Sequence, residues 1–248
     1  MELIVLGSSS KGNCYLLKAG SNAKEECLVL EAGISFAEVK KALKFNLNSI
    51  VGVLCSHRHG DHAKHLAKFC EAGITAHANV DVIESMPESA KAFCKTVKGM
   101  QCFTIGGFKV YVIPMLHDVP CVGFMVEHKE MGKLLFATDT YAIKYRIAGV
   151  NYFMVEANYN DEVLNKNIEN GTTPSFMRER LMKSHMEAKN TAAYLKECLK
   201  NGEDKRVKGI FLVHLSDNNS DAELCVKKVM AATGKPTQVL KAGDVISL

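Results

Sequence analysis

The sequence lacks the features that define membrane proteins, disordered proteins and strongly basic nucleic-acid-coating proteins. None of its apolar runs approaches the roughly 20 residues that a transmembrane helix needs. Hydrophobic residues make up 47% of the chain and charged residues 23%, which is ordinary for a folded globular protein. A net charge of +4 is too small to indicate a nucleic-acid partner by itself, although a local basic patch could still matter.

The cysteines lack the spacing of metal-binding or redox pairs. The nine cysteines include no Cys-x-x-Cys pair, and several lie in apolar patterns where buried thiols are common. The opening residues Met-Glu-Leu-Ile-Val-Leu-Gly have neither the basic stretch nor the cleavage-like site of a signal peptide. We therefore expect reduced cysteines and a cytoplasmic protein. With 248 residues, the chain suits one large α/β domain or two small ones.

One short stretch, residues 51–66, concentrates metal-ligand side chains. An apolar run predicts a strand up to Cys55, and a helix follows Gly60, so the intervening histidines lie in a strand-to-helix loop. His57 and His59 are two positions apart in extended backbone, so their rings point the same way and can bind one cation. Asp61 and His62 follow the glycine and point elsewhere, as ligands of a second cation a few ångströms away would.

The alternative is that these histidines are surface or core residues without a ligand role. Three histidines and one aspartate within six positions are hard to explain by packing, and they form the ligand set of Zn, Mn or Fe. We interpret His65 and His77, by contrast, as structural residues of a helix and a strand end.

Apolar periodicity predicts alternating strands and helices along the whole chain. The predicted strands cover residues 2–7, 14–19, 26–32, 51–55, 74–78, 152–158 and 207–212, with four more between 100 and 137 and short ones near 238–240 and 245–248 that close the second half. The first predicted helix begins at Ser35, with Glu38 completing a capping box. The other predicted helices cover residues 63–72, 79–98 with a break at Pro87, 162–169 and 221–233.

The histidine cluster His57-x-His59-x-Asp61-His62 resembles the HxHxDH motif of the metallo-β-lactamase superfamily. The later ligands of that superfamily have counterparts in the same order, within Met115-Leu-His117-Asp118, Thr138-Asp139-Thr140 and the loop that begins at His214. Asp139 directly follows an apolar strand, which makes a simple turn role less plausible. The resemblance implies an α/β fold, a four-layer αββα sandwich with mixed sheets, as a single domain over residues 1–248.

When the ligands of the superfamily are carried over to the matching positions of this chain, the resemblance implies seven ligands for two divalent metal ions, which could be Zn, Mn or Fe. The ligands implied for one ion are His57, His59 and His117, those for the other are Asp61, His62 and His214, and Asp139 bridges the two. Water activated between the ions would be the nucleophile, so no serine or cysteine nucleophile is needed. Glu31 stands where superfamily members usually carry an aspartate that orients the histidines.

His185 precedes a helical segment, as in the catalytic loop of phosphodiesterase members of the superfamily. The resemblance implies that it carries no metal and donates a proton to the leaving oxygen, whereas its other possible role is to cap a helix. We predict His185 and Asp61 as the catalytic residues. Candidates for substrate contacts are Arg180, Lys183, Lys189 and Asn218, and Arg178 lies among the same cations; solvation of the surface is the competing role.

Four stretches resemble one branch of the superfamily, the YycJ/WalJ-like exonucleases. They are Gly-Ser-Ser-Ser-Lys-Gly-Asn-Cys-Tyr at 7–15, His-Asp-x-x-x-x-Gly-Phe at 117–124, Thr-Asp-Thr at 138–140 and His-Leu-Ser-x-Asn-Asn at 214–219. This resemblance implies 5′-to-3′ exonuclease activity on DNA. The alternatives are a small-molecule phosphodiesterase of the phosphoribosyl cyclic phosphate type, another hydrolase of this fold, or a binding module that has lost its metals.

Overall fold

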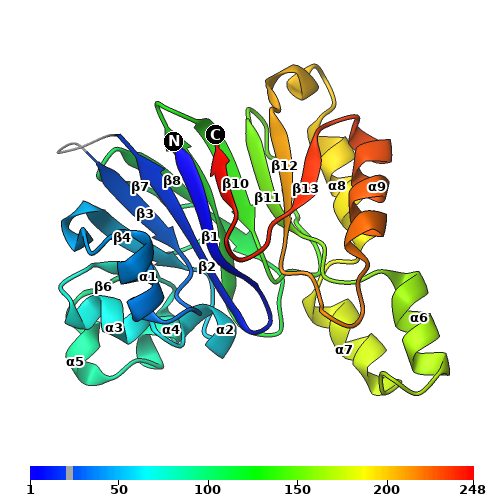
Figure 1. Ribbon diagram of the computed structural model, residues 1–248, viewed down its shortest axis with the longest axis horizontal. Helices are drawn as coiled ribbons and strands as arrows, with labels where there is room; N and C mark the ends of the chain where they lie inside the picture. The colour runs from blue at the N-terminus through cyan, green and yellow to red at the C-terminus, as the bar shows by residue number, and fades with distance from the viewer. Residues whose placement is uncertain (21–24) are drawn as a thin grey trace. The chain divides into compact units, whose positions relative to one another are not determined.

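The computed structural model describes residues 1–20 and 25–248 (Figure 1). The chain forms two compact units, and each contains parts of the sequence that are far apart. Unit 1 comprises Met1–Pro114, Phe124–Met131 and Lys241–Leu248, and unit 2 comprises Met115–Gly123 and Gly132–Leu240. Two seven-stranded mixed sheets have the strand orders β14-β1-β2-β3-β4-β5-β6 and β13-β12-β11-β10-β9-β8-β7. The single-domain organisation that we expected stays a prediction.

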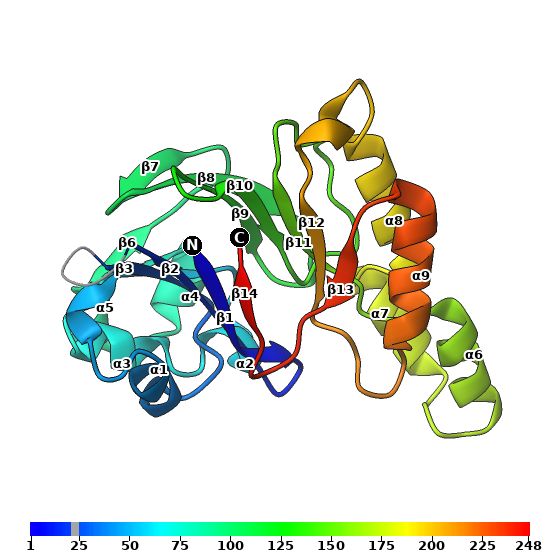
Figure 2. The ribbon, with the colours of Figure 1, turned by 45° about the horizontal axis from the view of Figure 1, so that its top comes forward.

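Unit 1 holds the first sheet and the helices that cover it. Its strands are β1 (Glu2–Ser9), β2 (Gly12–Ala19), β3 (Glu26–Leu30), β4 (Ile50–Cys55), β5 (Ala76–Ala78), β6 (Cys94–Thr96) and β14 (Val245–Ser247). Its helices are α1 (Phe36–Ala42), the 3-10 helix η2 (Leu47–Ser49), α2 (Gly60–Ala63), α3 (Leu66–Glu71), α4 (Val80–Glu84) and α5 (Glu88–Lys91). Helices α1, α3 and α5 lie together on one side of this sheet (Figure 2). Their apolar residues, such as Val39 and Phe69, are buried in one core with Leu16, Val29 and Val53 of the strands.

Unit 2 is built on four parallel strands. They are β10 (Gly132–Ala137), β11 (Tyr152–Glu156), β12 (Gly209–Val213) and β13 (Thr237–Val239). The helices are α6 (Asp161–Glu169), α7 (Phe176–Ser184), α8 (Ala188–Cys198), the 3-10 helix η3 (Glu203–Arg206) and α9 (Ala222–Thr233). Helices α8 and α9 lie side by side against these strands, and α6 and α7 form a separate pair near one end (Figures 1 and 2). Because parallel strands end at the same edge, the loops after them can converge.

The remaining strands of the second sheet are β7 (Cys102–Ile105), β8 (Phe108–Met115) and β9 (Cys121–His128). Strands β7 and β8 form an antiparallel hairpin through Gly106 and Gly107, and the left-handed φ of +53° at Gly106 allows the tight turn. The four strands predicted between residues 100 and 137 are therefore confirmed.

Three predictions about local structure are correct only in part. The helix predicted over 63–72 is observed as α3, but it begins three residues later than predicted, because the His65 N–H donates to the Ala32 carbonyl, 2.9 Å away, and so lies outside the helical ladder. The two short helices predicted over 79–98 on either side of Pro87 are observed as α4 and α5, but the region ends in strand β6, which pairs with β5; three residues are too few to show a periodicity. Strand β14 pairs with β1 in the first sheet and does not close the second half.

None of the nine cysteines, all of which are among the described residues, forms a disulfide, and their reduced state stays a prediction. The Cys70 and Cys94 sulfurs are 3.8 Å apart, whereas a disulfide needs about 2.05 Å. Among the described residues, no helix combines the length and the apolar character that crossing a membrane requires.

Candidate metal centre

In unit 1, the first histidine pair lies in the loop after β4. His57 is fully buried, and its Nε2 atom lies 3.1 Å from Nδ1 of His59. Two nitrogens bound to one zinc-sized ion at 2.0–2.1 Å with tetrahedral angles would be roughly 3.3 Å apart. The Ser56 hydroxyl engages the other ring nitrogen of His57, Nδ1, at 2.9 Å and thereby fixes the ring. The spacing of the pair therefore suits two ligands of one ion.

The second half of the motif is held by a buried carboxylate and a buried amide. Nε2 of His62 lies 3.2 Å from Oδ2 of Asp61 and 3.2 Å from the side-chain nitrogen of Asn13. On the other side of the ring, Oε2 of Glu31 lies 3.5 Å from Nδ1 of His62. The Glu31 carboxylate also accepts the Ser56 N–H at 3.3 Å, so it ties the motif loop to the end of β3. Sequence reasoning gave Asn13 no role, although it lies in the Gly7–Tyr15 stretch.

In unit 2, His117 follows strand β8 and is fixed by a backbone carbonyl. Its Nδ1 donates to the Ser184 carbonyl at 2.7 Å. Since Nδ1 carries the proton, Nε2 keeps its lone pair, which is the form that binds metals. Nε2 lies 3.0 Å from Oδ1 of Asp118 and 3.8 Å from Oδ2 of Asp139.

Asp139 and His214 come from the ends of β10 and β12, and both have left-handed backbone conformations. Their φ angles are +45° and +54°, and Glu31 after β3 has +65°. Such conformations are costly for residues other than glycine and tend to occur at functional sites. Oδ1 of Asp139 accepts the Thr138 hydroxyl at 2.7 Å and lies 3.4 Å from Nδ1 of His214. Both side chains are buried.

A residue that the sequence analysis missed, Glu156, lies at the centre of this set. It is the last residue of β11 and is fully buried. Oε1 of Glu156 accepts from Nδ1 of His185 at 2.6 Å and from Nδ1 of His214 at 3.2 Å. The Thr140 and Met186 N–H groups donate to Oε2, each at 3.1 Å. The available signal was an acid directly after the apolar run 152–155, at the strand edge where catalytic groups gather.

The charges of Glu156 and His185 stabilise each other. Burial alone would raise the pKa of Glu156, but the charge and hydrogen bond of His185 lower it. Burial alone would lower the pKa of His185, but the charge and hydrogen bond of Glu156 raise it above the usual histidine value. The buried carboxylate is therefore ionised near neutral pH and the imidazolium form of His185 is favoured.

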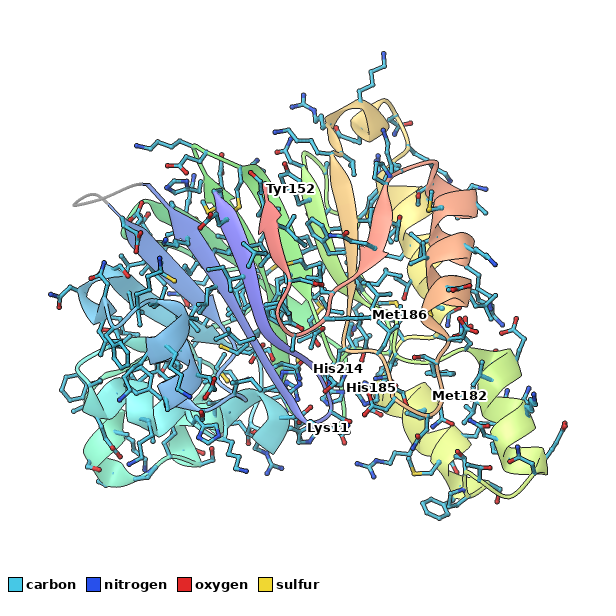
Figure 3. The ribbon with its side chains drawn as sticks, in the orientation of Figure 1. Lys11, Tyr152, Met182, His185, Met186 and His214 are labelled. Carbon is cyan, nitrogen blue, oxygen red and sulfur yellow. The ribbon has the colours of Figure 1, made fainter. Side chains whose placement is uncertain are left out.

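His185 and His214 lie side by side (Figure 3), with ring centroids 5.5 Å apart and nearly parallel planes. Donor atoms of Asp139, Glu156, His185 and His214 all lie within 4.8 Å of one another, close enough to surround an ion. His185, however, already uses Nδ1 for a short hydrogen bond to Glu156. His185 is also the C-cap residue of α7, because its backbone N–H donates to the Leu181 carbonyl at 2.8 Å, so it also caps a helix as the alternative proposed.

The candidate substrate residues occupy exposed positions in unit 2. Arg180 and Lys183 are on helix α7, which the sequence analysis did not predict as a helix, and Lys183 pairs with Glu179 at 2.5 Å. Lys189 pairs with Asp161 at 3.1 Å. The Asn218 carbonyl accepts a hydrogen bond from the side chain of Asn167 at 2.7 Å.

Of the two histidines that we interpreted as structural, His77 is buried in β5. Its ring stacks on Phe103 with centroids 4.9 Å apart. Burial and, secondarily, the charge of Lys95 lower its pKa to about 4. His65 caps the start of α3 through its backbone.

Comparison with known proteins decides the family. Residues 28–210 match the family described as the β-lactamase superfamily domain. The chain belongs to the metallo-β-lactamase superfamily. A protein named exodeoxyribonuclease YycJ, from Bacillus anthracis, is 28% identical over 251 residues, which cover 94% of this chain and 90% of that protein.

Two solved structures support the fold. The metallo-β-lactamase fold protein YhfI from Bacillus subtilis has a TM-score of 0.72 at 14% identity and covers 99% of this chain and 98% of its own. Human tRNase Z, short form, has a TM-score of 0.63 at 16% identity, and the match covers 100% of this chain and 99% of the tRNase Z chain. The predicted fold class and family are therefore confirmed, and the chain is a metallo-β-lactamase fold hydrolase with a histidine and aspartate cluster suited to divalent metal ions.

Proposed function

We propose that this hydrolase is a dinuclear metal-dependent phosphodiesterase that removes nucleotides from DNA in the 5′-to-3′ direction. The alternative substrate within the same chemistry is a small cyclic phosphodiester. The observation that carries the proposal is the Glu156–His185 pair, which holds a protonatable group next to the ligand candidates Asp139 and His214. The exodeoxyribonuclease relative, which covers nearly all of the chain, supports DNA as the substrate.

The donor groups fit divalent ions such as Zn, Mn or Fe. The set contains only imidazole nitrogens and carboxylate oxygens, which these ions accept, and it contains no thiolate. The Ser184 carbonyl fixes the proton of His117 on Nδ1 and leaves Nε2 to bind. By the order of ligands in the superfamily, His57, His59 and His117 would hold one ion, Asp61, His62 and His214 would hold the other, and Asp139 would contribute to both. Glu31 and Glu156 orient the rings of His62 and His214.

When bound, such ions lower the pKa of water and polarise a phosphoryl oxygen. The contribution of the chain itself is a proton at His185. Glu156 accepts from Nδ1 of His185 and favours its protonated form, so the opposite nitrogen, Nε2, can donate to the leaving oxygen. No serine or cysteine nucleophile enters this scheme.

The test is a substrate panel combined with metal analysis of the purified protein. We expect more than one equivalent of divalent metal, and shortening of 5′-phosphorylated DNA from its 5′ end in the presence of Mn²⁺. The Asp139→Ala protein should lack both metal and activity. Digestion from the 3′ end would reject the polarity, and hydrolysis of cyclic phosphodiesters alone would replace DNA by the small-molecule alternative. A metal-free protein with full activity would reject the mechanism.

A further inference from the structure

Helix α7 carries a line of exposed side chains that the proposed chemistry does not use. Phe176 begins the helix and is 69% exposed. Arg180 and Lys183 follow at four and seven positions along the chain and are also exposed. Residues with this spacing lie on the same face of a helix. One face of α7 therefore presents an aromatic ring followed by two cations.

The next face of the same helix is hollowed. A groove of about 380 Å³ is lined by Ser175, Arg178, Glu179, Met182 and Lys183. This volume is at the small end of the range of ligand sites, roughly 300–1,000 Å³. Met182, labelled on α7 in Figure 3, is 54% exposed and supplies apolar surface beside Lys183. The helix thus combines apolar surface and positive charge over its whole length.

Nearby side chains of α6 hold Arg178, whereas the side chains of Arg180 and Lys183 are exposed and can contact a ligand. Arg178 is held by Asn165 and lies 3.6 Å from Asp161, so α6 already occupies it. Lys183 pairs with Glu179, but both side chains are more than 70% exposed, and ion pairs at such positions contribute little. A phosphate can therefore replace Glu179 as the partner of Lys183.

The helix ends at the candidate catalytic histidine. Ser184, its last residue, accepts the hydrogen bond of His117, and His185 follows directly. At 1.5 Å per residue, the nine steps from Phe176 to His185 span roughly 13 Å. This length equals about four nucleotides of a stacked strand at 3.4 Å each. The line of exposed side chains therefore has the length of a short single strand that ends at His185.

We propose that helix α7 is a track for single-stranded nucleic acid, in which Phe176 stacks on a base and Arg180 and Lys183 contact phosphates. This inference rests on the proposed function and names the part of the substrate that α7 would hold. Single-strand-binding proteins combine the same two elements, aromatic rings and a positively charged path, because every base has a π face and every linkage a charge. Arg178 is not part of the track.

The first test compares two equally exposed phenylalanines. Phe176→Ala should weaken binding of a fluorescent 12-nucleotide DNA with nuclease-resistant phosphorothioate linkages about tenfold, measured by anisotropy. Phe45→Ala in unit 1, where Phe45 is also 69% exposed, should leave binding unchanged. Equal binding by both variants and the wild type would overturn the role of Phe176. Thermal unfolding at the wild-type temperature verifies that each variant is folded.

The second test measures how binding depends on salt. The double variant Arg180→Gln/Lys183→Gln should lower the slope of log affinity against log salt by about 1.4, since each neutralised phosphate contributes roughly 0.7 for single strands. Lys227→Gln, which removes an exposed cation of α9, should leave the slope unchanged. An unchanged slope in the double variant would overturn the phosphate contacts.

A small substrate separates this inference from the proposed function. Bis(p-nitrophenyl) phosphate is too short to reach Phe176 from His185, so Phe176→Ala should hydrolyse it at the wild-type rate while degrading the unmodified 12-nucleotide DNA more slowly. Wild-type protein that hydrolyses neither substrate would reject the proposed function. Hydrolysis of both substrates at wild-type rates by the Phe176→Ala protein would reject the track and leave the proposed function standing.

Discussion

The two units contribute ligand candidates in opposite ways. Unit 1 draws His57, His59, Asp61 and His62 from six consecutive positions, in the loop after β4 and the first turn of α2. Unit 2 collects its set from strand and helix ends that span almost a hundred residues, from His117 to His214. A set that is local in the sequence can be recognised from spacing alone, whereas a dispersed set depends on the order and direction of strands.

Each set is supported by one fully buried glutamate at a strand end, and the two supports differ in strength. Glu31 after β3 lies 3.5 Å from His62, whereas Glu156 at the end of β11 accepts from His185 at 2.6 Å and from His214 at 3.2 Å. Because shorter charge-assisted hydrogen bonds are stronger, the dispersed set depends more on its carboxylate. We expect the loss of Glu156 to cost more than the loss of Glu31.

The largest effect should come from removing a proposed metal ligand. Asp139→Ala should lower the hydrolysis rate on the order of 10³-fold or more, because bound metal ions supply several kcal/mol of transition-state stabilisation. Metal content, measured by elemental analysis, should fall with the rate. His59→Ala in unit 1 should remove less metal than Asp139→Ala, since only Asp139 is assigned to both ions. Full metal content in the Asp139→Ala protein would contradict the ligand assignment.

The sequence predicted the ligand candidates and one supporting residue, Glu31, but not the groups that support the ligand candidates of unit 2. Asp139 and His214 could be named because they follow apolar strands in the family order. Glu156 could not, since a glutamate at a strand end reads as an ordinary polar boundary until β11 is placed between β10 and β12. The hydrogen bond from His117 to the Ser184 carbonyl was equally hidden, because a backbone group 67 positions away leaves no mark in the sequence.

For the fold as well, elements set by local sequence patterns were predicted better than elements set by contacts between distant residues. Strands with clear alternation were predicted close to their observed bounds, as for the strand predicted over residues 2–7, which is observed as β1 (Glu2–Ser9). The errors came where a distant contact decided the structure, as in the Ala32 carbonyl that separates α2 from α3, or the pairing of β14 with β1. Helix α7 was missed because it is mostly polar and only Leu181 and Ser184 are buried in it, so no apolar stripe was visible.

Glu156→Gln should lower the rate roughly 100-fold at saturating metal, because His185 loses the charge that orients it and keeps it protonated. The combination with His185→Ala distinguishes this role from general damage. If Glu156 acts through His185, the double variant should be no slower than His185→Ala alone. Additive losses would instead assign the effect of Glu156 to His214.

Glu31→Gln should have a smaller effect, confined to metal binding. We expect the metal affinity to fall roughly tenfold, at the low end of the 10–100-fold range for residues that orient ligands, with the rate restored by excess metal. Competition with a chromophoric chelator measures this change. Glu71→Gln on the exposed end of α3, in the same unit, should leave the affinity unchanged. If the hydrolysis rate of Glu31→Gln at saturating metal were as low as that of Glu156→Gln, the contrast between the two glutamates would be removed.

The smallest effect concerns His77, a histidine of unit 1 outside the motif. Its pKa falls from 6.5 to about 4 because burial disfavours the charged ring. As the pH falls, His77 therefore takes up its proton in the unfolded chain before it does so in the folded protein. The contribution of neutral His77 to the free energy of unfolding is complete above pH 6.5 and is lost as the pH falls towards 4. At pH 5 the loss should be about 2 kcal/mol. His77→Phe keeps the stack on Phe103 without titrating, so urea unfolding in the presence of a chelator should show a smaller drop in stability from pH 7.5 to 5 than in the wild type; an equal drop would mean that His77 protonates normally.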